Sequence, residues 1–289
     1  MAIDYERLKN RAFPEIDQTY TTRDTILYAL GIGVGADPLN DDHVRFTFEE
    51  HEGFAPLPTM PVVMAGPGFW MREEDSGITW QQVLHGEQRL TIHNPLPASG
   101  TVVGRTYIQD IIDKGEGRGA LIYVARDTHD VATGAHISTS VSTTFARADG
   151  GFGGPTGPTL PVHSLPDRAP DIVDDVPTLP QAALIYRLSG DTNPLHASPA
   201  VATQAGFAAP ILHGLCSYGV AGWSILRTVC GGAPARLREF NLRFSAPVYP
   251  GETLRSEIWQ DGETVSFRTS VVERDLVVLN NGFARISAG

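Results

Sequence analysis

The chain has 289 residues, of which 42% are hydrophobic and 19% charged, and its formal net charge at neutral pH is −11. This length exceeds that of a usual single domain, so we expect two compact units or one large duplicated unit. The negative charge argues against nucleic acid or an anionic membrane surface as a partner. No apolar run is long enough to cross a bilayer and no signal core is present at the N-terminus, which predicts a soluble, cytoplasmic protein.

In the first half, one helix and several strands are expected in chain order. Residues 21–33 (TTRDTILYALGIG) predict a helix that begins at a threonine cap and ends at glycines. The segments 101–112, 119–130 and 136–148 are rich in β-branched and aromatic residues, which predicts strands, and their short connections predict antiparallel pairing. The GIGVG stretch at 31–35 follows a helix instead of a strand, so it is not expected to bind a dinucleotide.

The middle of the chain predicts a linker, and the second half repeats the same kinds of element. Residues 149–170 are dense in Gly and Pro, which predicts an extended linker between an N-terminal unit, 1–148, and a C-terminal unit, 171–289. Residues 213–230 form an apolar segment that ends before Gly231, which predicts a helix covered on nearly all sides. Strands are expected at three further segments: 252–261, 263–275 and 276–287.

The two halves resemble each other. RLTIHNPLPASGTVVGRTYIQDIIDKGEG begins at Arg89 and NLRFSAPVYPGETLRSEIWQDGETV begins at Asn241; each has a strand, a proline bend, a glycine turn and a second strand. The pattern favours an internal duplication, although two hairpins that share turn chemistry would give the same signal. Each half is then an α+β unit in which one helix packs on a curved antiparallel sheet.

The only cysteines, Cys216 and Cys230, are 14 residues apart in the predicted C-terminal helix. A helix would hold them roughly 20 Å apart, which is beyond the reach of a disulfide. We therefore expect buried free thiols and a reducing compartment.

One polar stretch, YRLSGDTNPLH at 186–196, combines turn-forming residues with acid and base groups. Pro194 fixes its own backbone and restricts the residue before it, so an ordered bend can direct Asp191 and His196 to a common point. A carboxylate and an imidazole suit proton transfer to and from water. A polar surface turn is the alternative. Asp191, His196 and His213 do not have the spacing of helical metal ligands, so we expect no metal.

The segment PILHGLC places His213 and Gly214 at the start of the apolar helix. Free backbone N–H groups and the helix dipole at this position can stabilise an oxyanion, and glycine allows a ligand to approach closely. His213 has two open interpretations, a packing or capping histidine and a functional one. The chain lacks the serine-hydrolase elbow and the phosphate-binding P-loop, so those two chemistries are not expected.

These segments together resemble a known family. YRLSGDTNPLHASPAVATQAGFAAPILHGLC is similar to the signature of the R-specific, type 2 enoyl-CoA hydratases, the MaoC-like branch of the hot-dog superfamily, and the likeness extends to YALGIGVG, LHGEQRLTIHNPLP, DKGEG and RFSAPVYPGETL. The resemblance implies a double hot-dog fold, in which each half is a long central helix wrapped by a curved antiparallel sheet. It also implies that only the second half carries the catalytic residues.

The resemblance assigns roles residue by residue. It makes Asp191 and His196 the catalytic dyad, with Asn193 orienting the water and the Gly214 N–H binding the thioester oxygen. The acyl-CoA substrate would be contacted by a further set: His85, Gly86, Lys114, His213 and Phe244. A local cation such as Lys114 also suits an acidic protein that binds an anionic substrate.

The implied reaction is reversible hydration of a trans-2-enoyl-CoA to a (3R)-3-hydroxyacyl-CoA, with no metal or redox cofactor and with a homodimer as the assembly. Two other functions stay open: a hot-dog thioesterase, which would direct water to the carbonyl carbon, and a non-catalytic acyl-CoA binding protein. The length and branching of the acyl chain are not fixed by the sequence.

Overall fold

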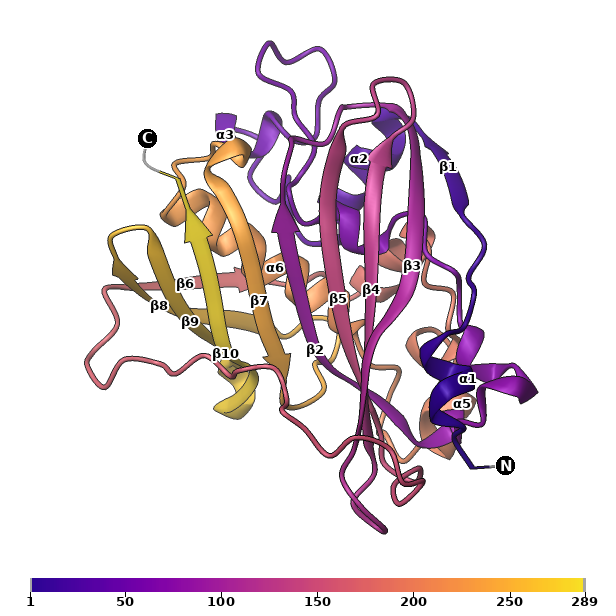
Figure 1. Ribbon diagram of the computed structural model, residues 1–289. Coiled ribbons are helices and arrows are strands. Elements are labelled where there is room, and N and C mark those ends of the chain that lie inside the picture. The colour runs from indigo at the N-terminus through magenta and orange to yellow at the C-terminus, as the bar shows by residue number, and fades with distance from the viewer. Residues whose placement is uncertain (1, 288–289) are drawn as a thin grey trace.

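The computed structural model describes residues 2–287, and these form a single ten-stranded antiparallel sheet with helices on one face (Figure 1). The first five strands are β1 (Ile16–Tyr20), β2 (Val83–Ile92), β3 (Gly100–Asp113), β4 (Ala120–Asp130) and β5 (His136–Ala146). The other five are β6 (Ile172–Pro177), β7 (Leu237–Phe244), β8 (Thr253–Asp261), β9 (Thr264–Val271) and β10 (Leu276–Ile286).

The strand order supports the predicted duplication. The order is β1-β3-β4-β5-β2 in the first half and, continuing across the sheet, β7-β10-β9-β8-β6 in the second. Each half therefore has the same topology, and the two meet where β2 pairs with β7 from Glu87 opposite Arg243 to Thr91 opposite Glu239. Because backbone hydrogen bonds cross this junction, the halves share one sheet instead of forming separate mobile domains.

The helices lie on the inner face of the sheet, and one of them is almost wholly buried. They are α1 (Tyr5–Lys9), α2 (Thr22–Gly31), α3 (Asp41–Val44), α4 (Ala182–Tyr186), α5 (Pro199–Gln204) and α6 (Gly214–Thr228). In α6 the continuous run from Cys216 to Leu226 is buried. At Gly219 the helix comes so close to the first half that an added Cβ would lie 2.7 Å from Ile32. No helix within residues 2–287 is long and apolar enough to span a membrane.

The segment between β5 and β6 crosses the outer face of the sheet, opposite α6 (Figure 1). The backbone N–H of Leu160 donates to Tyr123, while Arg89 donates to the Pro161 carbonyl and Asn281 to the His163 carbonyl. No helix or strand lies between Ala146 and Ile172. Side-chain bonds to the backbone of this segment hold it against both halves of the sheet.

Most of the predicted elements are present, with local differences. The strand expected at 263–275 ends at Val271, because Val272–Arg274 form a 3-10 turn and Asp275 has a left-handed φ of 47°. The helix expected at 213–230 ends at Thr228, so Cys230 lies just beyond it; both cysteines are free and buried. The first-half helix is shorter than its counterpart, with 10 residues in α2 against 15 in α6.

Candidate active site

The polar stretch around Asp191 folds as two consecutive tight turns. Gly190 has φ 127°, a conformation open mainly to glycine. The backbone N–H of Asn193 donates to Asp191 Oδ1 at 3.1 Å, and the N–H of Leu195 donates to Asn193 Oδ1 at 3.1 Å. Pro194 then begins a 3-10 turn, Pro194–His196. These local bonds orient the chain from the acid to the imidazole, as the sequence predicts.

Asp191, His196 and His213 converge on one point. Each offers one oxygen or nitrogen atom, and these atoms all lie within 4.8 Å of one another. The two imidazole rings stack with centroids 3.8 Å apart, and the ring of Tyr186 lies 5.2 Å from that of His213. Both histidines are buried, while Asp191 keeps partial exposure. The bend and the start of α6 thus form a single acid and base cluster.

Backbone carbonyls define which ring nitrogens carry protons. His196 Nδ1 lies 2.8 Å from the Ile211 carbonyl, and His213 Nε2 lies 3.1 Å from the Asp191 carbonyl. A carbonyl only accepts, so each of these nitrogens donates. His196 Nε2 is then the unprotonated nitrogen of a neutral ring and can accept a proton.

Burial keeps both histidines neutral. It lowers the pKa of His213 to about 4, and the neighbouring His196 acts in the same direction. Burial also lowers the pKa of His196, against the opposing effects of the Ile211 hydrogen bond and the charge of Asp191. Both rings are therefore in the basic form at neutral pH.

The N-terminus of α6 opens beside this cluster. His213 is the N-cap and Gly214 the first helical residue, and Gly214 is exposed although the residues after Leu215 are buried. Within residues 2–287, the N–H groups of Gly214 and Leu215 have no hydrogen-bond acceptor. Free N–H groups at a helix start can stabilise negative charge that develops on an oxygen atom.

Two predicted substrate-binding residues reach this site from different halves. An added Cβ at Gly214 would lie 3.3 Å from Phe244, and the ring of Phe244 lies 4.7 Å from that of His85. Gly86 is the bulged residue where β2 slips its register against β5. Such a bulge redirects its neighbouring side chains, here His85. His85 is exposed, although the protein atoms around its ring displace enough water to lower its pKa to about 4.

Lys114 lies in the turn between β3 and β4. Its backbone N–H donates to the Gly119 carbonyl. The preceding Asp113 accepts backbone N–H groups from Gly151 and Gly153, so the turn is tied to the linker. Within residues 2–287 the Lys114 ammonium has no hydrogen bond or ion pair with another side chain, and it stays available for an anionic ligand.

The ring geometry at the cluster suits proton transfer better than metal binding. A zinc ion would lie about 2.0–2.1 Å from each nitrogen, in the plane of each ring. The planes of His196 and His213 are stacked 3.8 Å apart and differ by only 28°, so an ion at that distance from both rings could not lie in both planes. Their other nitrogens are engaged with backbone carbonyls.

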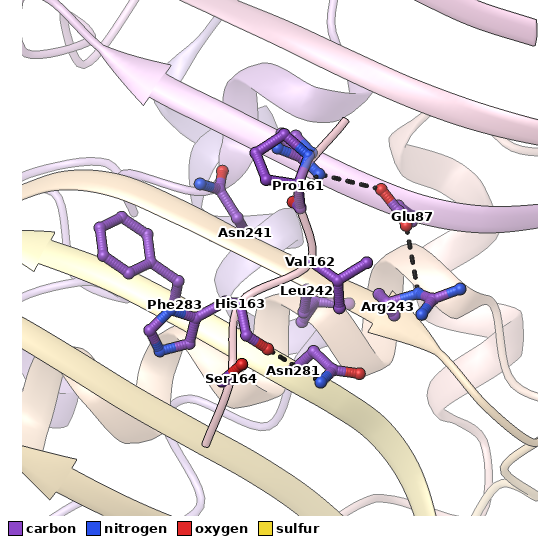
Figure 2. A pocket seen from close by; sticks show the side chains of 11 residues that line it. Glu87, Pro161, Val162, His163, Ser164, Asn241, Leu242, Arg243, Asn281 and Phe283 are labelled. Atoms are coloured by element: carbon purple, nitrogen blue, oxygen red, sulfur yellow. Dashed lines mark hydrogen bonds and ion pairs between the residues drawn. The ribbon is translucent and has the colours of Figure 1, made fainter. Parts of the chain in front are cut away.

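One surface pocket lies away from this cluster. It has a volume of about 330 Å³ on the outer face of the sheet, under the linker segment 161–164 (Figure 2). Glu87 on its floor pairs with Arg89 at 3.2 Å and with Arg243 at 3.1 Å. Because no member of the acid and base cluster lines the pocket, it is not the candidate active site.

Comparisons with known proteins match the chain over nearly its whole length. The MaoC like domain matches residues 161–281, and the MFE-2 hydratase 2 N-terminal domain matches residues 18–148. The 3-hydroxyacyl-thioester dehydratase Y of Mycobacterium tuberculosis is 41% identical, with all of both chains covered. The chain belongs to the MaoC-like dehydratase family.

Other members of the MaoC-like family agree. The peroxisomal enoyl-CoA hydratase 2 of Arabidopsis thaliana is 35% identical over 92% of this chain and 90% of its own. The crystal structure of a MaoC-like dehydratase from Phytophthora capsici has a TM-score of 0.87 at 33% identity and covers 98% of this chain and 99% of its own. The double hot-dog fold implied by the sequence is thereby confirmed.

Two parts of the site are backbone carbonyls that sequence reasoning missed. The Ile211 carbonyl determines the proton position of His196. The Val63 carbonyl, from the first half, lies 3.5 Å from the position of an added Cβ at Gly190. A backbone carbonyl exists at every residue, so neither contact leaves a signal in the residue types.

The buried histidines predict a stability that depends on pH. His213 has a folded pKa of about 4, below the ordinary 6.5, so the unfolded chain binds its proton first as the pH falls. The contribution of neutral, buried His213 to the free energy of unfolding is complete above pH 6.5 and is lost as the pH falls towards 4. Urea denaturation across this range measures the decline. His213→Gln keeps a donor for the Asp191 carbonyl and should flatten the curve; an unchanged slope would contradict the assignment.

Proposed function

We propose that the protein catalyses the reversible hydration of trans-2-enoyl-CoA thioesters to (3R)-3-hydroxyacyl-CoA. Family membership supports an acyl thioester substrate. The observation that carries the proposal is the Nδ1 bond of His196 to the Ile211 carbonyl, since it leaves Nε2 as the base of a ring that clusters with the Asp191 carboxylate. The acid and base pair then faces a helix N-terminus with free N–H groups.

The mechanism follows from these positions. The thioester oxygen accepts the Gly214 N–H, which draws electron density from the C2–C3 double bond and makes C3 electrophilic. His196 Nε2, assisted by the Asp191 carboxylate, takes a proton from water as the water oxygen bonds to C3. The resulting enolate is neutralised when a proton is returned to C2, so one water molecule is added overall. Dehydration is the same sequence in reverse.

Asn193 and the first-half residues have supporting roles in this proposal. The Oδ1 atom of Asn193 is used by the Leu195 N–H, which leaves its amide NH₂ to orient the water. His85 and Phe244 form the wall opposite Gly214. Gly86 allows the substrate to approach the bulged strand.

The reaction needs no metal in this proposal, because the dyad alone can activate the water. Exhaustive chelation followed by metal analysis tests this, and activity that is lost on chelation and restored by one divalent ion would contradict it. The proposal also includes a homodimer and a cytoplasmic location. Sedimentation analysis of the purified chain and cell fractionation test these two statements.

Two simultaneous signals distinguish the candidate functions. Loss of the ultraviolet absorbance of a conjugated enoyl-CoA without thiol release indicates hydration, whereas thiol release indicates a thioesterase. Binding with neither signal leaves an acyl-CoA binding protein. The buried imidazole of His196 favours a catalyst over a binder, because simple binding needs no unprotonated buried base.

Lys114→Ala is expected to weaken acyl-CoA binding while turnover at saturation stays close to that of the parent. A free ammonium attracts the phosphates of CoA, and this attraction is least screened at low salt, so the rise in KM should be largest there. Steady-state kinetics at several salt concentrations measure the effect. Arg118→Ala, an exposed cation in the same turn, is the matched control. A fall in turnover with unchanged KM would place Lys114 in the chemistry instead.

A further inference from the structure

A buried guanidinium on the inner face of the first half has no acidic partner. Arg126, in β4, donates from Nη2 to the carbonyls of Pro61 at 3.1 Å and Val62 at 2.8 Å. Within residues 2–287 no carboxylate pairs with it, and burial alone lowers its pKa to about 10. Arg126 is therefore still protonated at neutral pH. An unpaired buried charge is costly, so its presence calls for a partner.

The remaining donors of Arg126 are unused. Its Nε is buried without an acceptor, and so is the hydroxyl of Thr106, the residue opposite it on β3. Its Nη1 has no acceptor within residues 2–287. An added Cβ at Gly66 would lie only 2.8 Å from Nη1, so glycine at this position leaves the guanidinium its room. The side chain as a whole keeps accessible surface.

Arg126 shares its face of the sheet with the candidate active site. His85 pairs with Thr144 and Arg126 pairs with Ser140, so the two lie four residues apart along β5. Midway between them, Ser142 on the same face is also partly accessible. Four residues of strand correspond to roughly 13 Å along β5, and the two strand spacings between β2 and β4 add roughly 10 Å across it, so the separation is roughly 16 Å. His85, Ser142 and Arg126, each with accessible surface, thus follow one another on the inner face of the sheet.

The segment that Arg126 holds also reaches the catalytic bend. Pro61 and Val62 belong to the 3-10 turn η1 (Met60–Val63). The next carbonyl, that of Val63, lies against Gly190, directly before Asp191. A single short turn therefore separates the guanidinium from the dyad loop.

We propose that Arg126 forms a subsite for a carboxylate at the far end of the substrate's acyl chain. This inference rests on the proposed hydratase function and defines its substrate class as trans-2-enoyl-CoA thioesters that end in a second carboxyl group. A carboxylate supplies both the missing charge and an acceptor for Nη1, in a charge-assisted hydrogen bond. An extended chain advances roughly 1.2 Å per bond, so a separation of roughly 16 Å corresponds to roughly thirteen bonds.

The test compares two series of trans-2-enoyl-CoA substrates of increasing length, with and without the terminal carboxylate. For each length, the ratio of kcat/KM for the carboxylated and plain substrates is measured. We expect this ratio to rise to a maximum near a chain of about thirteen carbons, at least about tenfold above its value for the shortest pair. Arg126→Met should flatten the profile. Because the readout is a ratio, a general loss of activity does not affect it.

Two further variants complete the experiment. Gly66→Ala keeps the arginine and places a Cβ against Nη1, so it should lower the maximum even where Arg126→Met fails to fold. Arg105→Met removes an exposed arginine of the adjacent strand, paired with Glu15, and should leave the profile unchanged.

The outcomes separate the two proposals. A wild-type protein that hydrates plain substrates but gives a flat ratio overturns the inference and makes Arg126 an anchor of η1 only. A maximum that persists in both Arg126→Met and Gly66→Ala also overturns it. Failure to hydrate any substrate of either series instead refutes the proposed function, and the subsite falls with it.

Discussion

Asp191→Asn and His196→Asn are each expected to lower hydratase turnover by at least about a hundredfold while the protein stays folded. Asparagine at 191 keeps an oxygen for the Asn193 N–H, and the backbone carbonyl that accepts from His213 is unchanged. Asparagine at 196 can place its amide nitrogen near the position of Nδ1 and keep the bond to the Ile211 carbonyl, while the base Nε2 is removed. Both variants therefore delete chemistry and preserve the turns.

The double variant provides the sharper measurement. If the dyad activates one water as a unit, Asp191→Asn with His196→Asn should be little slower than either single variant, whereas independent contributions would multiply. Steady-state rates at saturating substrate, with circular dichroism and acyl-CoA titration as controls, give the comparison. Folded variants that keep most of their hydratase activity would make the bend a structural turn and the catalytic assignment wrong.

The pH profile adds a second readout of the same pair. Burial lowers the pKa of His196, so its basic form should persist below the ordinary range of a histidine. The rate is expected to fall only on the acid side of pH 6.5, as His196 gains a proton. The midpoint of this acid fall is measured from kcat/KM against pH. The fall itself should disappear in His196→Asn.

The fold was predictable from sequence where pattern and packing agree. The strands from β3 to β5 alternate, and in α6 the apolar residues occur on nearly all sides because α2 and the sheet enclose it. The edge strands β1 and β6 were missed. Asp17, Asp174 and Asp175 interrupt their short sequences, and only pairing with β3 and β8 makes them strands. Tertiary hydrogen bonding outweighs local propensity there.

The candidate site also has residues that the sequence could predict and residues that it could not. Asp191, His196 and Gly214 were predictable because their side chains, or the lack of one, carry a chemical signature in a short segment. The position of Lys114 relative to the dyad stays a prediction, since its turn contacts the linker and no hydrogen bond leads from it to the cluster. Arg126 carries no sequence signal at all. Its lack of an acidic partner is a property of the folded surroundings only.

Gly214→Pro is expected to lower turnover by about a hundredfold to a thousandfold, because proline has no N–H to donate to the developing oxyanion. Proline is well tolerated at the first position of a helix. Proline also requires an extended backbone at the residue before it. His213, which precedes position 214, already has such a backbone, with φ −59° and ψ 135°. The substitution should therefore remove one donor and leave α6 intact.

Gly214→Ala is the matched control for this loss. It keeps the N–H and adds a Cβ that would lie 3.3 Å from Phe244, as the proline ring also would. Turnover that falls far more in Gly214→Pro than in Gly214→Ala assigns the effect to the missing donor. Equal losses would assign it to crowding against Phe244, and the oxyanion role of Gly214 would be wrong. Acyl-CoA affinity should change little in either comparison, since an oxyanion donor contributes mainly in the transition state.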